Sequence, residues 1–289
     1  MRQVKSNIDG TIQYFLPYSE HFDCLRDRKD NVIFYGNGKG YPEVSGGRAP
    51  GNAHLVEKAE LQRLAETLGP QFQWAANSTR PRYTRNVKEM LRRVAASGSS
   101  IVVADFDFAN RIKQDFPDIP LTASCIMSLK MDFQKIRTSG LFHRVVTPQF
   151  WNYDFDELGQ LEAPGELVTI VNSKCDHRED PQRCLNHYNY YSKLYAPLPH
   201  KELEKEWSGK CEFWRYMTMT GKLLSQLGMN TLSDTLSMYL KYRHERFPPW
   251  RVVIQELSRR GFMRFKFEGR SLTPLKEWAE PIISFIETQ

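Results

Sequence analysis

Long apolar runs are missing from this sequence. No window of the 289 residues approaches the roughly 18 consecutive apolar residues that a membrane-spanning helix requires. The polar start, residues 1–7, has no apolar core behind it and therefore lacks the pattern of a signal peptide. We expect a cytoplasmic protein without a membrane partner, whose five cysteines are reduced.

Several common catalytic motifs are missing as well. The glycine-rich loop of residues 36–51 has neither the dinucleotide-binding glycine pattern nor the lysine–serine ending of a phosphate-binding loop. No serine stands in a glycine–x–serine–x–glycine motif. A protease needs an activated nucleophile, and although Ser124 and Cys125 are available, no local signature surrounds them. Proteolysis is therefore the less expected activity.

Basic residues outnumber acidic ones, with 40 Lys and Arg against 34 Asp and Glu and a formal net charge of +6. This balance favours polyanionic partners. The basic residues gather in residues 80–93 and 241–270, and aromatic residues interleave with the second stretch. Such a mixture is typical of a nucleic-acid surface, although a solvated basic face over core aromatics is the alternative. The candidate nucleic-acid-binding residues are Arg82, Arg85, Arg243, Arg246 and Arg251.

Apolar runs alternate with amphipathic stretches along the chain, which predicts an α/β fold with a parallel sheet. Eight strands over this length are the expected count for a (β/α)₈ TIM-type barrel, with a doubly wound open sheet as the alternative. No linker divides the chain, so we expect one domain over residues 1–289, with a helical insertion at residues 172–245 between strands seven and eight. The predicted strands are residues 12–16, 31–36, 72–77, 100–104, 120–124, 142–146, 167–171 and 262–267, and the predicted helices are residues 54–67, 86–97, 108–116, 201–242, 250–260 and 273–288.

Reactive groups of such barrels follow the carboxyl ends of the strands. That rule selects Asn77, Asp105, Asp107 and Ser124 as candidate catalytic residues. The two aspartates can serve as acid or base, or hydrogen-bond a base edge. N-capping of the following helix by Asp107 is the structural alternative. The same rule also selects Cys125, Thr147, Gln149, Asn172, Cys175, Glu268 and Arg270.

Three of the cysteines lie close together after the seventh predicted strand: Cys175, Cys184 and Cys211. In a reducing compartment such clustering indicates a metal or iron–sulfur site more than disulfides, and unlinked cysteines in helices are the alternative. Metal sites of this kind require four ligands. The fourth thiolate is not obvious, since Cys125 follows a strand and Cys24 lies in an early loop. His187 or His177 can instead complete a Cys₃His zinc site, and a helix-surface histidine is the alternative for His187.

Four phrases occur in a familiar order: residues 74–77, 102–105, 117–124 and 265–270. Together they resemble the barrel of the collagenase-like peptidase family, over roughly residues 30–150 and 165–289. The resemblance implies a barrel enzyme, because several members are similar to oxygen-independent hydroxylases of ubiquinone precursors or of RNA bases, and some carry a four-cysteine [4Fe–4S] cluster. The sequence departs from the family pattern at Asp180, which stands where a cysteine is expected before residues 181–183, while Cys184 lies just beyond.

Three functions from different classes follow. The first is an iron–sulfur enzyme that hydroxylates a nucleobase in nucleic acid. The second is a zinc-containing enzyme that exchanges bases in the manner of the transglycosylases. The third is a non-catalytic barrel that serves as a binding subunit. Nucleic acid is the expected partner, and a protein partner or a second copy of the chain fits the third function.

Overall fold

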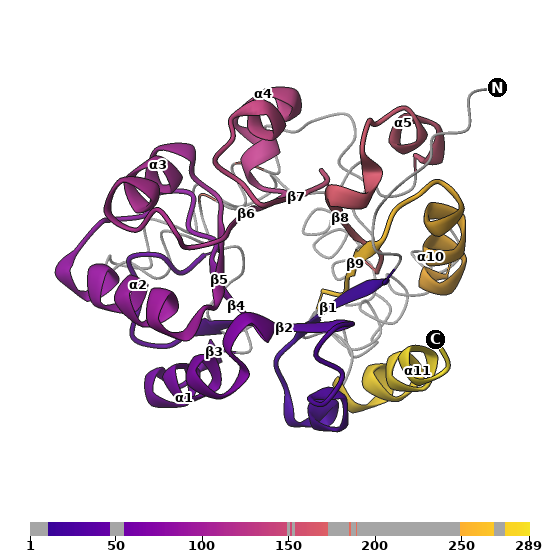
Figure 1. Ribbon diagram of the computed structural model, residues 1–289, viewed down its shortest axis with the longest axis horizontal. Coiled ribbons are helices and arrows are strands. Elements are labelled where there is room, and N and C mark those ends of the chain that lie inside the picture. The colour runs from indigo at the N-terminus through magenta and orange to yellow at the C-terminus, as the bar shows by residue number, and fades with distance from the viewer. Residues whose placement is uncertain are drawn as a thin grey trace, which may run out of the picture.

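The computed structural model of the protein describes residues 11–46, 55–148, 151, 154–172, 185, 189, 249–268 and 275–289. Its strands form one parallel sheet in the order β1-β9-β8-β7-β6-β5-β4-β2-β3, and a further pairing of β1 with β2 closes eight of them into a barrel (Figure 1). The strands are β1 (Gln13–Pro17), β2 (Val32–Gly38), β3 (Leu55–Val56), β4 (Phe72–Ala76), β5 (Ser100–Val103), β6 (Leu121–Ala123), β7 (Arg144–Val146), β8 (Leu167–Ile170) and β9 (Arg264–Lys266).

The closure of the barrel depends on β1, which pairs with strands on both of its sides. Tyr14 lies in register with Val32 of β2 and with Phe265 of β9. An open sheet would place the first and last strands at opposite edges. The predicted barrel is therefore confirmed, and the doubly wound alternative is wrong.

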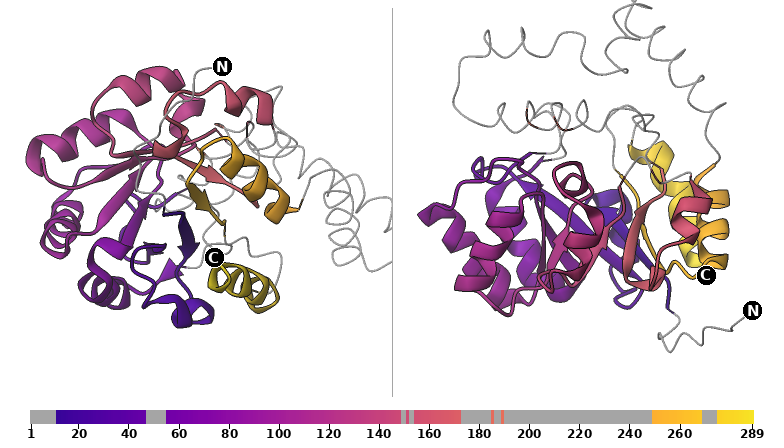
Figure 2. Two further views of the ribbon diagram at one scale, coloured as in Figure 1. Left: turned by 45° about the vertical axis from the view of Figure 1, so that its right-hand side comes forward. Right: turned by 90° about the horizontal axis from the view of Figure 1, so that it is seen from above.

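Helices surround the strands as an outer layer (Figure 2). Helix α2 shows how the sequence defines them: the Thr84 hydroxyl accepts a hydrogen bond from the Val87 amide at its start, and Gly98, in the left-handed region at φ 69°, ends it. The α-helices are α1 (Lys58–Leu68), α2 (Arg85–Ser97), α3 (Phe106–Asp115), α4 (Phe133–Thr138), α5 (Phe155–Gly159), α10 (Trp250–Arg259) and α11 (Leu275–Glu287), and the 3₁₀ helices are η1 (Glu20–Leu25), η3 (Gly69–Gln71), η4 (Met127–Leu129) and η6 (Pro164–Glu166).

The barrel interior is filled by side chains rather than left as a pore. A small apolar cluster, separate from the larger core between strands and helices, forms its middle layer. Nearer the amino ends of the strands, the Gln73 amide donates to the hydroxyls of Ser100 at 3.2 Å and Thr122 at 2.9 Å. We call the small apolar cluster the interior cluster; it consists of Phe15, Ile33, Val146, Val168 and Ile170.

Some element boundaries differ from the prediction for identifiable reasons. Helix α1 begins at Lys58 instead of residue 54, because Leu55–Val56 pairs with β2 as β3. Helices α4 and α5, which the sequence did not predict, have only six and five residues and show too little of a helical repeat. The predicted helix 201–242 and most of the insertion 172–245 lie outside the described residues.

The last helix packs where the barrel closes. Helix α11 contacts η1, and the Arg28 guanidinium donates to the carbonyl oxygens of Ile286 at 3.2 Å and Glu287 at 3.3 Å. No helix in the described ranges is long and apolar enough to cross a membrane.

Tyr14 provides a test of the core beneath α11. Its ring lies between Phe265 and Phe285, with centroids 6.3 and 6.1 Å away, and its buried hydroxyl has no hydrogen-bond partner in the described ranges. Removing an unsatisfied buried hydroxyl relieves its desolvation cost, so Tyr14→Phe is expected to raise the free energy of unfolding by up to about 1 kcal/mol. Urea denaturation at neutral pH measures this change, and a less stable variant would contradict it.

The stability gained by Tyr14→Phe is expected to depend on pH. Burial raises the pKa of Tyr14 to about 12. Because folding raises this pKa, the linked stability is complete below the unfolded value of about 10 and is lost as the pH rises toward the folded value. The advantage of Tyr14→Phe over the wild type should therefore grow in urea titrations at alkaline pH. Tyr83→Phe cannot serve as a control for the loss of an unpaired hydroxyl, because the Tyr83 hydroxyl donates a hydrogen bond to Asp115.

Candidate active site

The carboxyl ends of the barrel strands meet at one end of the molecule, because all of the strands are parallel. We call this end the mouth. The four candidate catalytic residues come from the segments that follow β4, β5 and β6, so they all belong to it. They differ in what their side chains contact.

Asn77 directly follows β4 and continues the alternation of Gln73 and Ala75, which face the interior. Its side chain is half-buried, and its buried Oδ1 atom has no hydrogen-bond partner among the residues that the structure describes. An amide oxygen in this state is costly to the fold, and a ligand that donates an N–H would satisfy it. Asn77 is therefore the best-placed acceptor for a ligand among the four candidates.

Asp105 caps helix α3, a role that the sequence analysis considered for Asp107. Its Oδ1 accepts from the Phe108 amide at 3.0 Å, which makes it the N-cap of α3. Its Oδ2 forms a 2.9 Å ion pair with Lys130, which also donates to the Thr79 carbonyl at 2.6 Å. These bonds tie together the segments after β4, β5 and β6. The alternative that Asp107 caps this helix is wrong: that residue lies exposed in the first turn of α3.

Ser124 also serves the backbone. Its side chain is buried, and its Oγ accepts from the Ile126 amide at 3.4 Å, which tightens the turn after β6. Across the part of the chain that the structure describes, no histidine hydrogen-bonds to Ser124. An activating base of the kind that a serine protease uses is thus missing from these contacts.

Cys125 lies at the mouth beside Ser124. It is half-buried and packs against the interior cluster, as Tyr35 does. Cys24 is different, because it is exposed in η1, outside the barrel ring. Neither cysteine is in a disulfide. Of the two, only Cys125 is placed to contribute a thiolate at the mouth.

Lys266 is an interior residue that the sequence analysis missed. Its side chain is only 7% exposed, and its Nζ lies 4.4 Å from the centroid of the Tyr35 ring, a cation–π distance. The Tyr35 hydroxyl in turn donates to the Phe267 carbonyl at 2.7 Å. The alternation of Phe265, Lys266 and Phe267 was the available signal: in a strand with both aromatics in the outer core, the lysine must face inward.

The end of β8 is fastened to the end of β9 by a pair of hydrogen bonds. The Asn172 amide donates to the Glu268 carbonyl at 2.9 Å, and the Glu268 backbone N–H donates to Asn172 Oδ1 at 2.7 Å. This clamp fixes at the mouth the point from which the cysteine-containing segment continues.

The candidate metal ligands Cys175, Cys184, Cys211 and His187 lie outside the described residues. Within the described ranges, no group of three or more His, Cys, Asp and Glu side chains is arranged to hold a metal ion.

The predicted basic surface is partly described. Arg82 and Arg85 are exposed before and at the start of α2, and Arg251 is exposed at the start of α10. These helices stand on opposite sides of the ring (Figure 1). Arg251 also donates to the Pro281 carbonyl at 3.2 Å and lies 5.2 Å over the Trp250 ring. Arg243 and Arg246 fall outside the described part of the chain.

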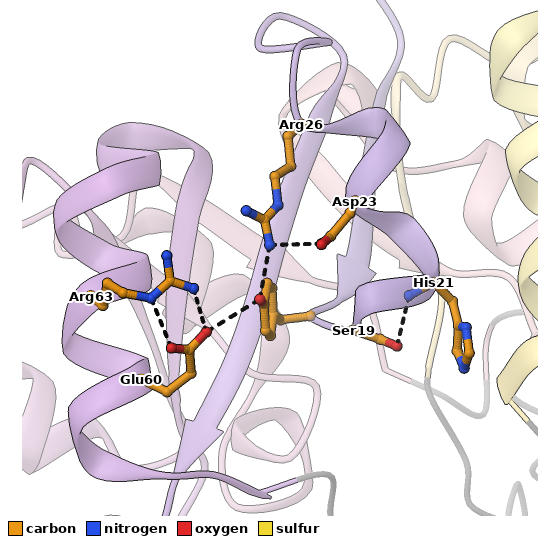
Figure 3. A network of polar contacts seen from close by, with 7 residues as sticks. Ser19, His21, Asp23, Arg26, Glu60 and Arg63 are labelled. Carbon is orange, nitrogen blue, oxygen red and sulfur yellow. Dashed lines mark hydrogen bonds and ion pairs between the residues drawn. The ribbon is translucent and has the colours of Figure 1, made fainter.

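A polar network fastens η1 to α1 beside the barrel (Figure 3). The Arg26 guanidinium pairs with Asp23 at 2.7 Å and donates to the Tyr18 hydroxyl at 2.9 Å, which donates to Glu60 at 3.4 Å. Arg63 holds the Glu60 carboxylate with two hydrogen bonds, which lowers the pKa of Glu60. Burial raises the pKa of Tyr18, against the opposing charge of Arg26. Both carboxylates are paired with arginines, so we assign this network to structure rather than catalysis.

Fold and site together define a (β/α)₈ barrel with a polar mouth. The structure is similar to a solved structure titled "The Structure of the U32 Peptidase Mk0906", with a TM-score of 0.47 and 14% sequence identity, covering 68% of this chain and 81% of that chain. The U32 peptidases are the collagenase-like peptidase family that the sequence motifs resemble. No protein-family model matches the sequence, and comparison with curated proteins finds no match.

Proposed function

We propose that this protein is a metal- or iron–sulfur-dependent enzyme that modifies a nucleobase in nucleic acid, by hydroxylation. The observation that carries the proposal is the set of groups at the mouth: the Cys125 thiol, the unpartnered Asn77 oxygen and the buried Lys266 ammonium. A rigid barrel supports all three. The resemblance to the collagenase-like peptidase family supplies the reaction class.

The chemistry of the donor set fits a thiolate-bound metal. Cys125 contacts the interior cluster, whose Ile170 precedes the clamped Asn172 by two residues. Cys175 follows Asn172 by three residues, a length of chain that spans at most about 10 Å. We therefore propose Cys125 and Cys175 as ligands of one metal site, since thiolates are the preferred ligands of iron–sulfur clusters and of zinc. A bound cluster would supply one-electron chemistry.

The other mouth residues suit the recognition of a base. A nucleobase presents N–H donors and carbonyl acceptors on its Watson–Crick edge once it has left its stack. Asn77 Oδ1 would accept from such an N–H. The Lys266 ammonium would donate to a base carbonyl and stabilise negative charge that develops on its oxygen. Asp105 and Lys130 would keep the surrounding segments in place.

Binding to nucleic acid gives a prediction for the basic surface. The variant Arg243→Ala/Arg246→Ala/Arg251→Ala is expected to bind a single-stranded oligonucleotide more weakly than the wild type and with a shallower salt dependence. Each lost phosphate contact should reduce the slope of log affinity against log salt by about 0.7, so three contacts should reduce it by about 2. A fluorescence titration at several salt concentrations measures both quantities.

A control variant separates this effect from a general loss of positive charge. Arg92, Arg111 and Arg259 are exposed residues of α2, α3 and α10, beyond the first turn of each helix. Their triple alanine variant removes the same charge and should keep the wild-type slope. Equal slopes in the wild type and the first variant, or no binding at low salt, would count against a nucleic-acid substrate and favour a small molecule.

A further inference from the structure

Two arginines face the barrel interior at the end opposite the mouth. Arg144 begins β7 and Arg264 begins β9. Both donate to the same acceptor, the Oε1 atom of Gln13 in β1: Arg144 Nη2 at 3.3 Å and Arg264 Nε at 3.1 Å. The Arg144 guanidinium also lies 5.4 Å over the ring of Phe15, a member of the interior cluster. Three strands thus bring two cations to one neutral amide.

Within the part of the chain that the structure describes, no acidic contact balances the positive charge of this pair. Among the described residues, no carboxylate lies within ion-pair distance of either guanidinium. Burial and, to a smaller extent, the positive charge of the neighbouring Arg264 lower the pKa of Arg144 to about 10. Burial likewise lowers the pKa of Arg264, while the more distant Glu166 acts in the opposite direction. Holding two partly buried like charges around a neutral acceptor costs free energy that an anion would offset.

The donors that an anion needs are present. Among the described residues, Arg144 donates through Nη2 only, and its buried Nε has no hydrogen-bond partner. Arg264 uses only Nε. The remaining guanidinium groups, Nε and Nη1 of Arg144 and both Nη groups of Arg264, make no hydrogen bond to the described residues. Planar N–H forks of this kind match the oxygens of a phosphate group.

We propose that Arg144, Arg264 and Gln13 form a binding site for a small oxyanion of the phosphate class at the amino-terminal end of the barrel. The interior cluster separates this site from the mouth. It is therefore distinct from the substrate site and does not depend on the proposed function. The anion is either free phosphate or the phosphate group of a small monoester.

The test uses the full chain with inorganic phosphate and with glycerol phosphate as probes, at ionic strength held constant with sodium chloride. Calorimetry of the wild type should show one anion bound per chain, and its melting temperature should rise by several degrees at saturation. Tighter binding of glycerol phosphate would identify a monoester as the ligand, and equal or weaker binding would identify the free anion. A wild type that responds to neither probe would overturn the proposal.

The decisive variant is Gln13→Glu, which supplies the missing negative charge with little change in shape. It should melt above the wild type in phosphate-free buffer and should bind phosphate at least about tenfold more weakly. The matched control is Gln134→Glu, which places the same carboxylate beside Arg137 on the exposed surface of α4 and should bind phosphate as the wild type does. An unchanged phosphate affinity in Gln13→Glu would overturn the site.

Discussion

A serine in place of any one of three cysteines is expected to abolish the iron or zinc binding that we propose for this protein. The three variants are Cys175→Ser, Cys184→Ser and Cys211→Ser. A cluster or tetrahedral site needs four ligands, and a serine hydroxyl does not replace a thiolate at neutral pH. Metal analysis of each variant after purification without oxygen measures the loss. Full metal content in all three variants would contradict a shared site.

The two remaining cysteines extend this experiment. Cys125 packs on the interior cluster at the mouth, whereas Cys24 is exposed in η1 on the outside of the ring. If Cys125 is the fourth ligand, Cys125→Ser should also lose metal. Cys24→Ser is the matched control and should keep it. Loss of metal in Cys24→Ser but not in Cys125→Ser would reverse our assignment.

Replacement of Asp105 is expected to produce a large loss of stability. Asp105→Ala removes the N-cap of α3, worth about 1 kcal/mol. It also removes the ion pair with Lys130, in which both side chains are about three-quarters buried. Together these changes should cost about 2 kcal/mol and lower the melting temperature by roughly 4–8 °C. Thermal and urea unfolding measure the loss.

Two variants distinguish the contributions of the cap and the ion pair. Asp105→Asn keeps a good N-cap but loses the charge, so it should be destabilised less than Asp105→Ala. Asp107→Ala changes an exposed residue of the same helix turn and should stay within about 0.5 kcal/mol of the wild type. Equal losses in Asp105→Ala and Asp107→Ala would contradict the structural assignment of Asp105.

The barrel could be predicted from the sequence because its strands carry strong signals. Each is a short apolar run between polar turns, and residues 100–104 and 167–171 are apolar on both faces, as parallel strands buried on both sides must be. The short helices α4 and α5 carried no such signal. Each buries only one or two side chains, Phe133 and Ile136 in α4 and Leu158 in α5, which is too few to form a helical repeat.

The positions of the candidate residues in the barrel could be predicted, but their contacts could not. The strand-end rule placed Asn77 and Asp105 at the mouth, yet nothing in the sequence shows that Lys130, 25 residues later, occupies one carboxylate oxygen of Asp105. The sequence also did not tell which of Asp105 and Asp107 caps α3. Charged residues inside strands were a signal of interior polar groups that the prediction did not use. Lys266, Arg144 and Arg264 all stand in predicted or observed strands, and alternation turns them toward the interior.

We propose that the cysteines bind an iron–sulfur cluster or another metal for base modification. The most direct test is the iron, acid-labile sulfide and zinc content of the wild-type protein purified without oxygen. We expect iron and sulfide in equal amounts, about four of each per chain for a [4Fe–4S] cluster, with visible absorbance that dithionite bleaches. Zinc alone would exclude the hydroxylase and favour base exchange. Protein that contains neither iron nor zinc would contradict the account.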